Sequence, residues 1–176
     1  CRNAVQALSV TPTSATQTTG AITQAIPDND LTGITNTLAI SGIPSYAVIS
    51  GITVNFNISH NNDGDLNINL KAPNGSILNL VNRKGGTGNN FTNTTVSSAG
   101  TTTFASSSSP FTGTFAANAA NNVGATGYKS NVAAFSSLYG TPNGNWTLVI
   151  DDEVAARAGT LTSWTITINY TSPITW

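Results

Sequence analysis

Hydrophobic and polar residues alternate along four stretches of this chain with a period of two residues. The stretches are ISGITVNFNIS (49–59), DLNINLKA (65–72), NWTLVID (145–151) and SWTITINY (163–170). In the second stretch, Leu66, Ile68 and Leu70 fall on one face of a strand, whereas Asn67 and Asn69 fall on the other. This alternation predicts half-buried antiparallel strands.

Turn-forming residues separate these stretches, and no segment has the 3.6-residue period of an amphipathic helix. Gly, Pro, Asn and Asp gather at 63–65, 73–75, 85–86, 142–144 and 158–159. Short alternating strands between such turns predict an all-β fold, a jelly-roll-like antiparallel β-sandwich. Trp146 and Trp164 occupy inward strand positions and are expected in the core.

The pattern predicts one domain between two linkers. Residues 1–20 include the Thr-rich SVTPTSATQTTG and are interpreted as a linker or the remnant of an upstream domain, to which Cys1 would belong. The sandwich is assigned to residues 21–171, and residues 172–176 to the start of a C-terminal linker. Residues 97–140 lack a clear period but hold too many large apolar side chains for a disordered linker, so irregular or short-strand structure is expected there.

Charged residues make up only 7% of the chain, whereas soluble domains average about 25%. The surface must therefore be solvated by Thr, Ser, Asn and Gly, which is typical of domains displayed outside the cell, and a secreted or cell-surface location is expected. The net charge is −1 and the six Lys and Arg residues form no basic cluster, which argues against a nucleic-acid partner. No apolar run reaches the length of about 18 residues that a membrane span needs.

His60 is the only histidine, and any Ser-His-Asp arrangement would have to use it. It lies where an alternating strand ends and a turn begins, and the chain has no G-x-S-x-G nucleophile motif. A structural hydrogen-bonding role is therefore favoured over catalysis, and no catalytic residue is assigned. Zinc is disfavoured as well, because one histidine and a terminal cysteine fall short of the three or four ligands that it takes.

All seven acidic residues lie in three short groups, PDND (27–30), NNDGD (61–65) and IDDE (150–153). Carboxylates this close repel one another unless a cation lies between them, and calcium takes such oxygen ligands. We expect a calcium site assembled from several loops, with ligands drawn from Asp28, Asp30, Asp63, Asp65, Asp151 and Asp152. An EF-hand loop is not matched, because Ile68 and Asn74 stand where it needs Gly and Glu. Two alternative hypotheses remain: the carboxylates form turns, or two of them flank the cleft of a glycosidase.

Two longer stretches resemble the P domain of proprotein convertases, also called the P/Homo B domain. NISHNNDGDLNINLKAPNGSILNLVNRKGGTGNNF (57–91) is similar to its first half, through a hydrophobic strand followed by Ser59-His60, Gly64-Asp65-Leu66 and Pro73-x-Gly75. GTPNGNWTLVIDDEVAARAGTLTSWTITI (140–168) is similar to its second half, through Asn143-Gly144-x-Trp146-x-Leu148, Asp151 and Gly159-Thr160-Leu161-x-x-Trp164. The likeness covers about residues 22–170.

The resemblance implies a jelly-roll sandwich in which His60 and Asp65 belong to a structural strand-turn signature. It further implies a non-catalytic accessory domain that stabilises or positions the catalytic domain of the same chain, a secreted endopeptidase of serine or other type. The Asn-, Thr- and Ser-rich composition favours a bacterial source. The alternative is a module that binds a protein, collagen-like or polysaccharide ligand, with Tyr128, Tyr139 and Phe111 as a candidate surface patch.

Overall fold

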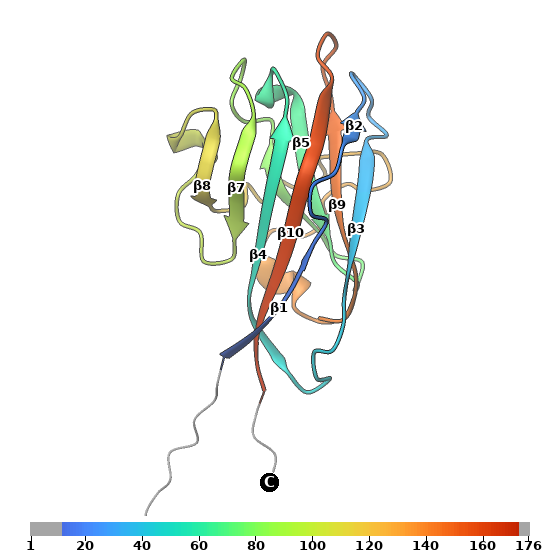
Figure 1. The fold of residues 1–176 in the computed structure, drawn as a ribbon, viewed down its shortest axis with the longest axis vertical. Helices are drawn as coiled ribbons and strands as arrows, with labels where there is room; N and C mark the ends of the chain where they lie inside the picture. The colour runs from blue at the N-terminus through green and yellow to red at the C-terminus, as the bar shows by residue number, and fades with distance from the viewer. Residues whose placement is uncertain (1–11, 173–176) are drawn as a thin grey trace, which may run out of the picture.

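Over residues 12–172, which the computed structural model describes, ten strands form two sheets that pack face to face (Figure 1). The six-stranded sheet has the order β1-β10-β4-β7-β8, with β2 also paired to β10. Its strands are β1 (Pro12–Thr18), β2 (Gln24–Ile26), β4 (Val48–Ser59), β7 (Phe91–Ser97), β8 (Phe111–Phe115) and β10 (Gly159–Thr171). The four-stranded sheet has the order β3-β9-β5-β6. Its strands are β3 (Ile34–Ile40), β9 (Gly144–Asp152), β5 (Leu66–Lys71) and β6 (Ile77–Asn82).

The predicted all-β sandwich is confirmed. All strand pairs are antiparallel except β7 and β8, which are parallel. The helical segments in the described chain are three 3-10 turns, η1 (Asp63–Asp65), η2 (Phe104–Ser106) and η3 (Phe135–Leu138). No helix in this part of the chain is long and apolar enough to cross a membrane.

Each of the four alternating stretches forms one strand, β4, β5, β9 or β10. Their inward residues make the core between the sheets, as the pattern predicts. Trp146 and Trp164 are fully buried, and each indole N–H still has an acceptor: the Pro142 carbonyl at 3.0 Å and the Asn36 Oδ1 at 2.7 Å, respectively. The largest side chains thus enter the core without leaving a buried donor unpaired.

The assignment of residues 1–20 to a linker is wrong for Pro12–Thr18, which form β1. This strand pairs with β10 over its whole length, from Pro12↔Thr171 to Thr18↔Thr165. Six of its seven side chains are exposed, so this edge strand is held by main-chain hydrogen bonds. Its sequence therefore shows no alternation of hydrophobic and polar residues. The structure describes neither residues 1–11, which include Cys1, nor residues 173–176. The expectations for these residues therefore stay predictions.

The irregular region 97–140 contributes to the core, as expected. Phe104 of η2 stacks on Phe115 of β8 with ring centroids 4.4 Å apart, and Phe91 of β7 stacks on Phe111 at 5.3 Å. Phe111 is 1% exposed, so the surface patch proposed to include it is wrong for this residue. These rings fill the space under the six-stranded sheet where β7 and β8 run parallel.

Phe104→Ala is expected to lower the free energy of unfolding by about 3–5 kcal/mol, because it removes a buried ring and leaves a cavity among three other phenylalanines. Urea unfolding followed by tryptophan fluorescence measures this change. The matched control is Val48→Ala, since Val48 is 63% exposed and its truncation should cost less than about 0.5 kcal/mol. Equal effects of the two substitutions would contradict the assignment of residues 97–140 to the core.

Candidate functional site

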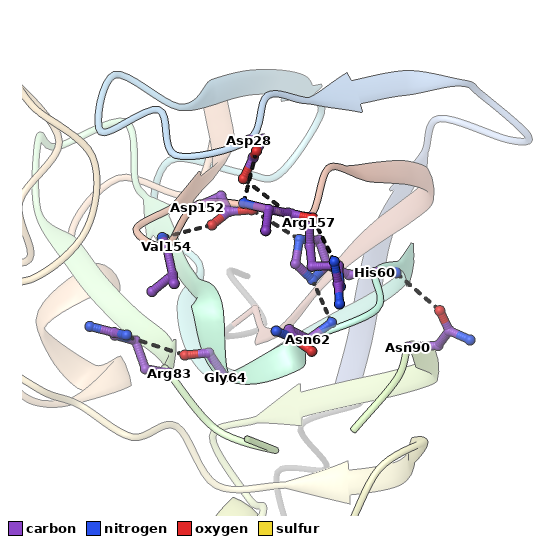
Figure 2. Close-up of polar contacts among 10 residues, drawn as sticks. Asp28, His60, Asn62, Gly64, Arg83, Asn90, Asp152, Val154 and Arg157 are labelled. Carbon is purple, nitrogen blue, oxygen red and sulfur yellow. Dashed lines mark hydrogen bonds and ion pairs between the residues drawn. The ribbon is translucent and has the colours of Figure 1, made fainter. Parts of the chain in front are cut away.

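His60 and Asp152 form a buried pair that joins the two sheets at one end of the sandwich (Figure 2). His60 follows β4 of the six-stranded sheet, and Asp152 ends β9 of the other. The His60 Nε2 lies 3.0 Å from Asp152 Oδ2, and both side chains are fully buried. The Asn62 main-chain N–H donates to His60 Nδ1 at 3.1 Å, so the hydrogen-bond network assigns the proton to Nε2. Both ring nitrogens are therefore occupied by structural partners, as the predicted hydrogen-bonding role requires.

The surrounding chain is shaped to hold this imidazole. The Asn90 side chain accepts a hydrogen bond from the His60 main-chain N–H at 3.0 Å, and the Asn90 N–H donates to the His60 carbonyl at 3.1 Å. Gly159 begins β10 directly beside the ring, where an added Cβ would lie 2.5 Å from His60 Cδ2. The glycine that opens β10 is thus needed for close packing on His60.

Asp28 and Asp30 both accept hydrogen bonds from main-chain N–H groups in turns. The Asp28 carboxylate accepts hydrogen bonds from the main-chain N–H groups of Ala156 and Arg157, at 3.0 and 3.1 Å, and so fastens the β9–β10 hairpin (Figure 2). Asp30 Oδ1 accepts from the Thr32 N–H at 2.8 Å. Asp30 thus forms its own turn, whereas Asp28 caps a turn that is distant in the sequence.

Asp63 and Asp65 lie in η1, between β4 and β5. Asp63 is fully buried, and the Ser109 hydroxyl donates to its Oδ2 at 2.6 Å, whereas Oδ1 has no partner among the described residues. Burial raises the pKa of Asp63 to about 6, and the Ser109 hydrogen bond offsets part of the rise. Asp65 is 8% exposed, and its Oδ2 is unpartnered within the same residues.

Asp151 lies directly opposite Asn67 on neighbouring strands, on the outer face of the four-stranded sheet. Both are 1% exposed, although the alternation predicted that Asn67 would face solvent. Asn67 Nδ2 donates to Glu153 Oε1 at 2.7 Å, and Arg83 contacts the other oxygen of Glu153 at 3.3 Å. Burial, followed by the Glu153 carboxylate, raises the pKa of Asp151 to about 7.

A loop spanning residues 118–132, here called the cover loop, covers Asn69, the next outward residue of β5. Its two ends pair with the main chain of β6, and its middle crosses β5. Asn69 Nδ2 donates to the carbonyls of Val123 and Tyr128 at 2.8 and 3.0 Å. Gly124, with φ of +99°, passes so close that an added Cβ would collide with the Asn69 amide. The outward side chains of Asn69 and Asn79, which are hydrogen-bonded to each other, are therefore buried under this loop.

The six predicted calcium ligands are thus divided among several local arrangements. Within residues 12–172, no group of three or more His, Cys, Asp or Glu side chains is placed so that it could hold a metal ion. Sequence reasoning did not select Asn67 or Glu153, which lie beside Asp151. Glu153 follows Asp151 by two residues, so the strand period placed it on the same face. Nothing in the sequence indicated that a loop would cover that face.

The model of the proprotein convertase P-domain family matches residues 49–168. The chain belongs to this family. The match spans the strand before His60, the η1 turn and the Gly-Thr-Leu sequence at Gly159, so the features that surround the buried pair all lie within the P domain.

The chain is similar in sequence to a Streptomyces enzyme and in fold to a serine protease of Aeromonas sobria. The chain is 27% identical over 142 residues to leupeptin-inactivating enzyme 1 of Streptomyces exfoliatus, covering 81% of this chain and 24% of that enzyme. Its fold is similar to that of the Aeromonas sobria serine protease, solved with its chaperone (TM-score 0.56) and alone (0.51), each at 16% identity over 95% of this chain and 28% of the other. The chain thus spans about a quarter of the length of each of these proteins.

His60→Ala is expected to lower the free energy of unfolding by about 3–5 kcal/mol, because it leaves the Asp152 carboxylate buried without its partner. Chemical unfolding in urea measures the loss. Arg83→Ala, which breaks the partly exposed contact with Glu153, is the control and should cost less than about 1 kcal/mol. A cost for His60→Ala no larger than that of the control would contradict the structural role of the buried pair.

Asp63 is expected to make the domain less stable as the pH rises from about 4 to about 6. Its native pKa of about 6 lies above the ordinary value of 3.8, so the native state binds more protons than the unfolded state between these values. Stability is therefore lost as the carboxyl ionises, by roughly 2–3 kcal/mol over this window. Unfolding of the wild type and of Asp63→Asn in EDTA, from pH 4 to pH 7, should give a shallower pH dependence for the variant. Identical slopes would contradict the burial of an ionising Asp63.

Proposed function

We propose that this P domain is a non-catalytic accessory domain of a secreted bacterial protease, in which it stabilises or positions the catalytic domain. The observation that carries the proposal is family membership: the chain belongs to the proprotein convertase P-domain family and matches 24% of a Streptomyces enzyme. The engaged ring nitrogens of His60 support a structural role for the one imidazole in the chain. The low content of charged residues supports an extracellular location.

The end of the sandwich opposite the buried pair is the proposed contact with the catalytic domain. Pro12 at the start of β1, Thr171 at the end of β10 and Val48 at the start of β4 lie side by side there (Figure 1). Val48 is 63% exposed and the nearby Tyr46 is 55% exposed, so two exposed apolar side chains lie near the point where β1 begins and β10 ends. A tethered neighbour would cover this surface with little loss of entropy.

Removal of the domain from the longer chain that carries it is expected to lower the yield of folded protease and its melting temperature. Tyr46→Ser with Val48→Ser should lower the melting temperature of the protease in the same direction by a few degrees, because it removes the proposed contact. Leu31→Ser is the matched control, since Leu31 is 52% exposed in the loop before β3, at the other end of the sandwich. Unchanged yield and melting temperature on removal would overturn the accessory role.

A binding module is the second candidate, favoured by the surface of the six-stranded sheet. None of its strands contains Asp, Glu, Lys, Arg or His. Its outer face carries hydroxyl and amide groups that are hydrogen-bonded across strands, such as Thr16 to Thr167 and Asn55 to Thr95. Such a face suits an uncharged polysaccharide. This function would be favoured if removal of the domain abolished binding of the enzyme to an insoluble polysaccharide but left the melting temperature of the enzyme unchanged.

Calcium is proposed as the ion that supports the loops at the acidic end. What supports it is the concentration of carboxylates there, of which Asp63, Asp65 and Asp151 each have a buried oxygen with no protein partner among residues 12–172. Calcium prefers oxygen ligands of this kind from carboxylates, amides and main-chain carbonyls.

A further inference from the structure

Three loops form an open cleft of about 660 Å³ at the end of the sandwich that holds the His60–Asp152 pair. They are the turn after β4, the loop between β6 and β7, and the β9–β10 hairpin. This volume lies within the range of about 300–1,000 Å³ that is usual for sites of small ligands. The residues that line the cleft are Asn61, Asn62, Thr87, Asn89, Ala156, Arg157 and Ala158. Arg157 therefore supplies the charge of a lining that is otherwise neutral.

The three loops are fixed in place by hydrogen bonds of the main chain. The N–H groups of Asp63 and Gly64 donate to the carbonyls of Gly88 and Gly86, at 2.8 and 2.9 Å, and join the turn after β4 to the β6–β7 loop. Asp28 fastens the β9–β10 hairpin through two main-chain N–H groups. A cleft with fixed walls is pre-organised for binding, because a ligand need not order the loops at a cost in entropy.

The tip of the hairpin is strained at the residue before Arg157. Ala156 has a φ of +99°, a conformation that residues with a Cβ rarely adopt. The two oxygens of Asp28 hold this conformation by accepting the N–H groups of Ala156 and Arg157 (Figure 2). Arg157 Nη1 donates to the Ala156 carbonyl at 2.8 Å, which keeps the guanidinium beside the cleft. Backbone strain of this kind is found at ligand clamps, where the surrounding contacts maintain it.

The polar groups of the cleft are available to a ligand. Arg157 makes no ion pair within residues 12–172, and its bond to Ala156 uses one of the five guanidinium N–H donors. The side chains of Asn61, Asn62 and Asn89 make no hydrogen bond to the part of the chain that the structure describes; Asn62 contacts His60 through its main chain instead. The cleft thus presents one unpaired cation next to three unpaired amides.

These groups match the chemistry of a peptide that ends in a free carboxylate. An arginine binds a carboxylate through two parallel hydrogen bonds. A lining with a single cation suits a single negative charge, whereas a polyanion, such as a nucleic acid or a uronic-acid polymer, would leave most of its charges unpaired. Each amide side chain offers both a donor and an acceptor, as each peptide unit of a ligand does.

We infer that the cleft binds the C-terminal end of a peptide, with the carboxylate on Arg157 and the last peptide units on the amides of Asn61, Asn62 and Asn89. The apolar part of the lining consists of two alanines, so we expect little selection among ligand side chains. Cleavage by an endopeptidase produces such a carboxylate, and the site would keep the cut chain close to the protease. The source of the ligand rests on the proposed function, but the binding itself does not.

The test is an NMR titration of the isotope-labelled full chain with N-acetyl-trialanine, which has a free C-terminal carboxylate, and with its C-terminal amide. At concentrations up to about 10 mM, the acid should shift the side-chain signals of Arg157 and the three asparagines and bind at least about tenfold more tightly than the amide, because the amide lacks the charge that Arg157 pairs with. Arg157→Gln should abolish this preference. Arg157→Lys should keep part of it, since lysine retains the charge but not the planar fork.

Arg83→Gln is the matched control, because it is the same substitution at an arginine that contacts Glu153 and does not line the cleft. It should bind the acid as the wild type does, and both glutamine variants should change the melting temperature by less than about 2 °C. Absence of any shift with the acid would overturn the site, as would equal binding of acid and amide or a preference that survives Arg157→Gln. Tighter binding of a glucuronic-acid oligosaccharide would overturn the peptide as ligand. None of these outcomes alters the deletion experiment on the longer chain, so failure of the site and failure of the accessory role are distinguishable.

Discussion

The structure depends on one constraint: polar groups that are buried at one end of the sandwich must find hydrogen-bond partners. The His60 and Asp152 side chains satisfy it within the protein and, in doing so, join a strand end of one sheet to a strand end of the other. The same end carries carboxylates whose oxygens have hydrogen-bond partners only in part. A chain with 7% charged residues places nearly all of its acidic groups where they shape turns and strand ends rather than where they solvate the surface.

This arrangement gives the two ends of the domain different properties. One end is polar: Asp28 and Asn90 accept hydrogen bonds from main-chain N–H groups there, and Asp63 accepts one from the Ser109 hydroxyl. The other end carries the exposed Tyr46 and Val48 beside the points where β1 begins and β10 ends. A domain of this form suits an accessory role. One end offers an apolar contact to a neighbouring domain, and the other end is held together by internal hydrogen bonds.

The sequence predicted most of the sandwich, because period-two alternation directly reports strands with one buried face. It failed for β1, whose exposed side chains carry no such pattern, and for Asn69, which alternation assigned to solvent. The cover loop explains the second failure: it lies more than 50 residues away in the sequence, and the position of Gly124 over Asn69 follows from tertiary structure alone. The spacing of the acidic groups could not show that Asp28 caps a hairpin while Asp151 is buried opposite an amide.

The pairing of His60 with Asp152 is the interaction on which the polar end of the domain depends most directly. A double-mutant cycle of His60→Ala and Asp152→Ala, measured by urea unfolding, isolates the energy of this pairing. We expect the two substitutions to be coupled by about 1–3 kcal/mol, because either one alone leaves a buried polar group without its partner. Additive effects of the two substitutions would contradict a structural role for the pair.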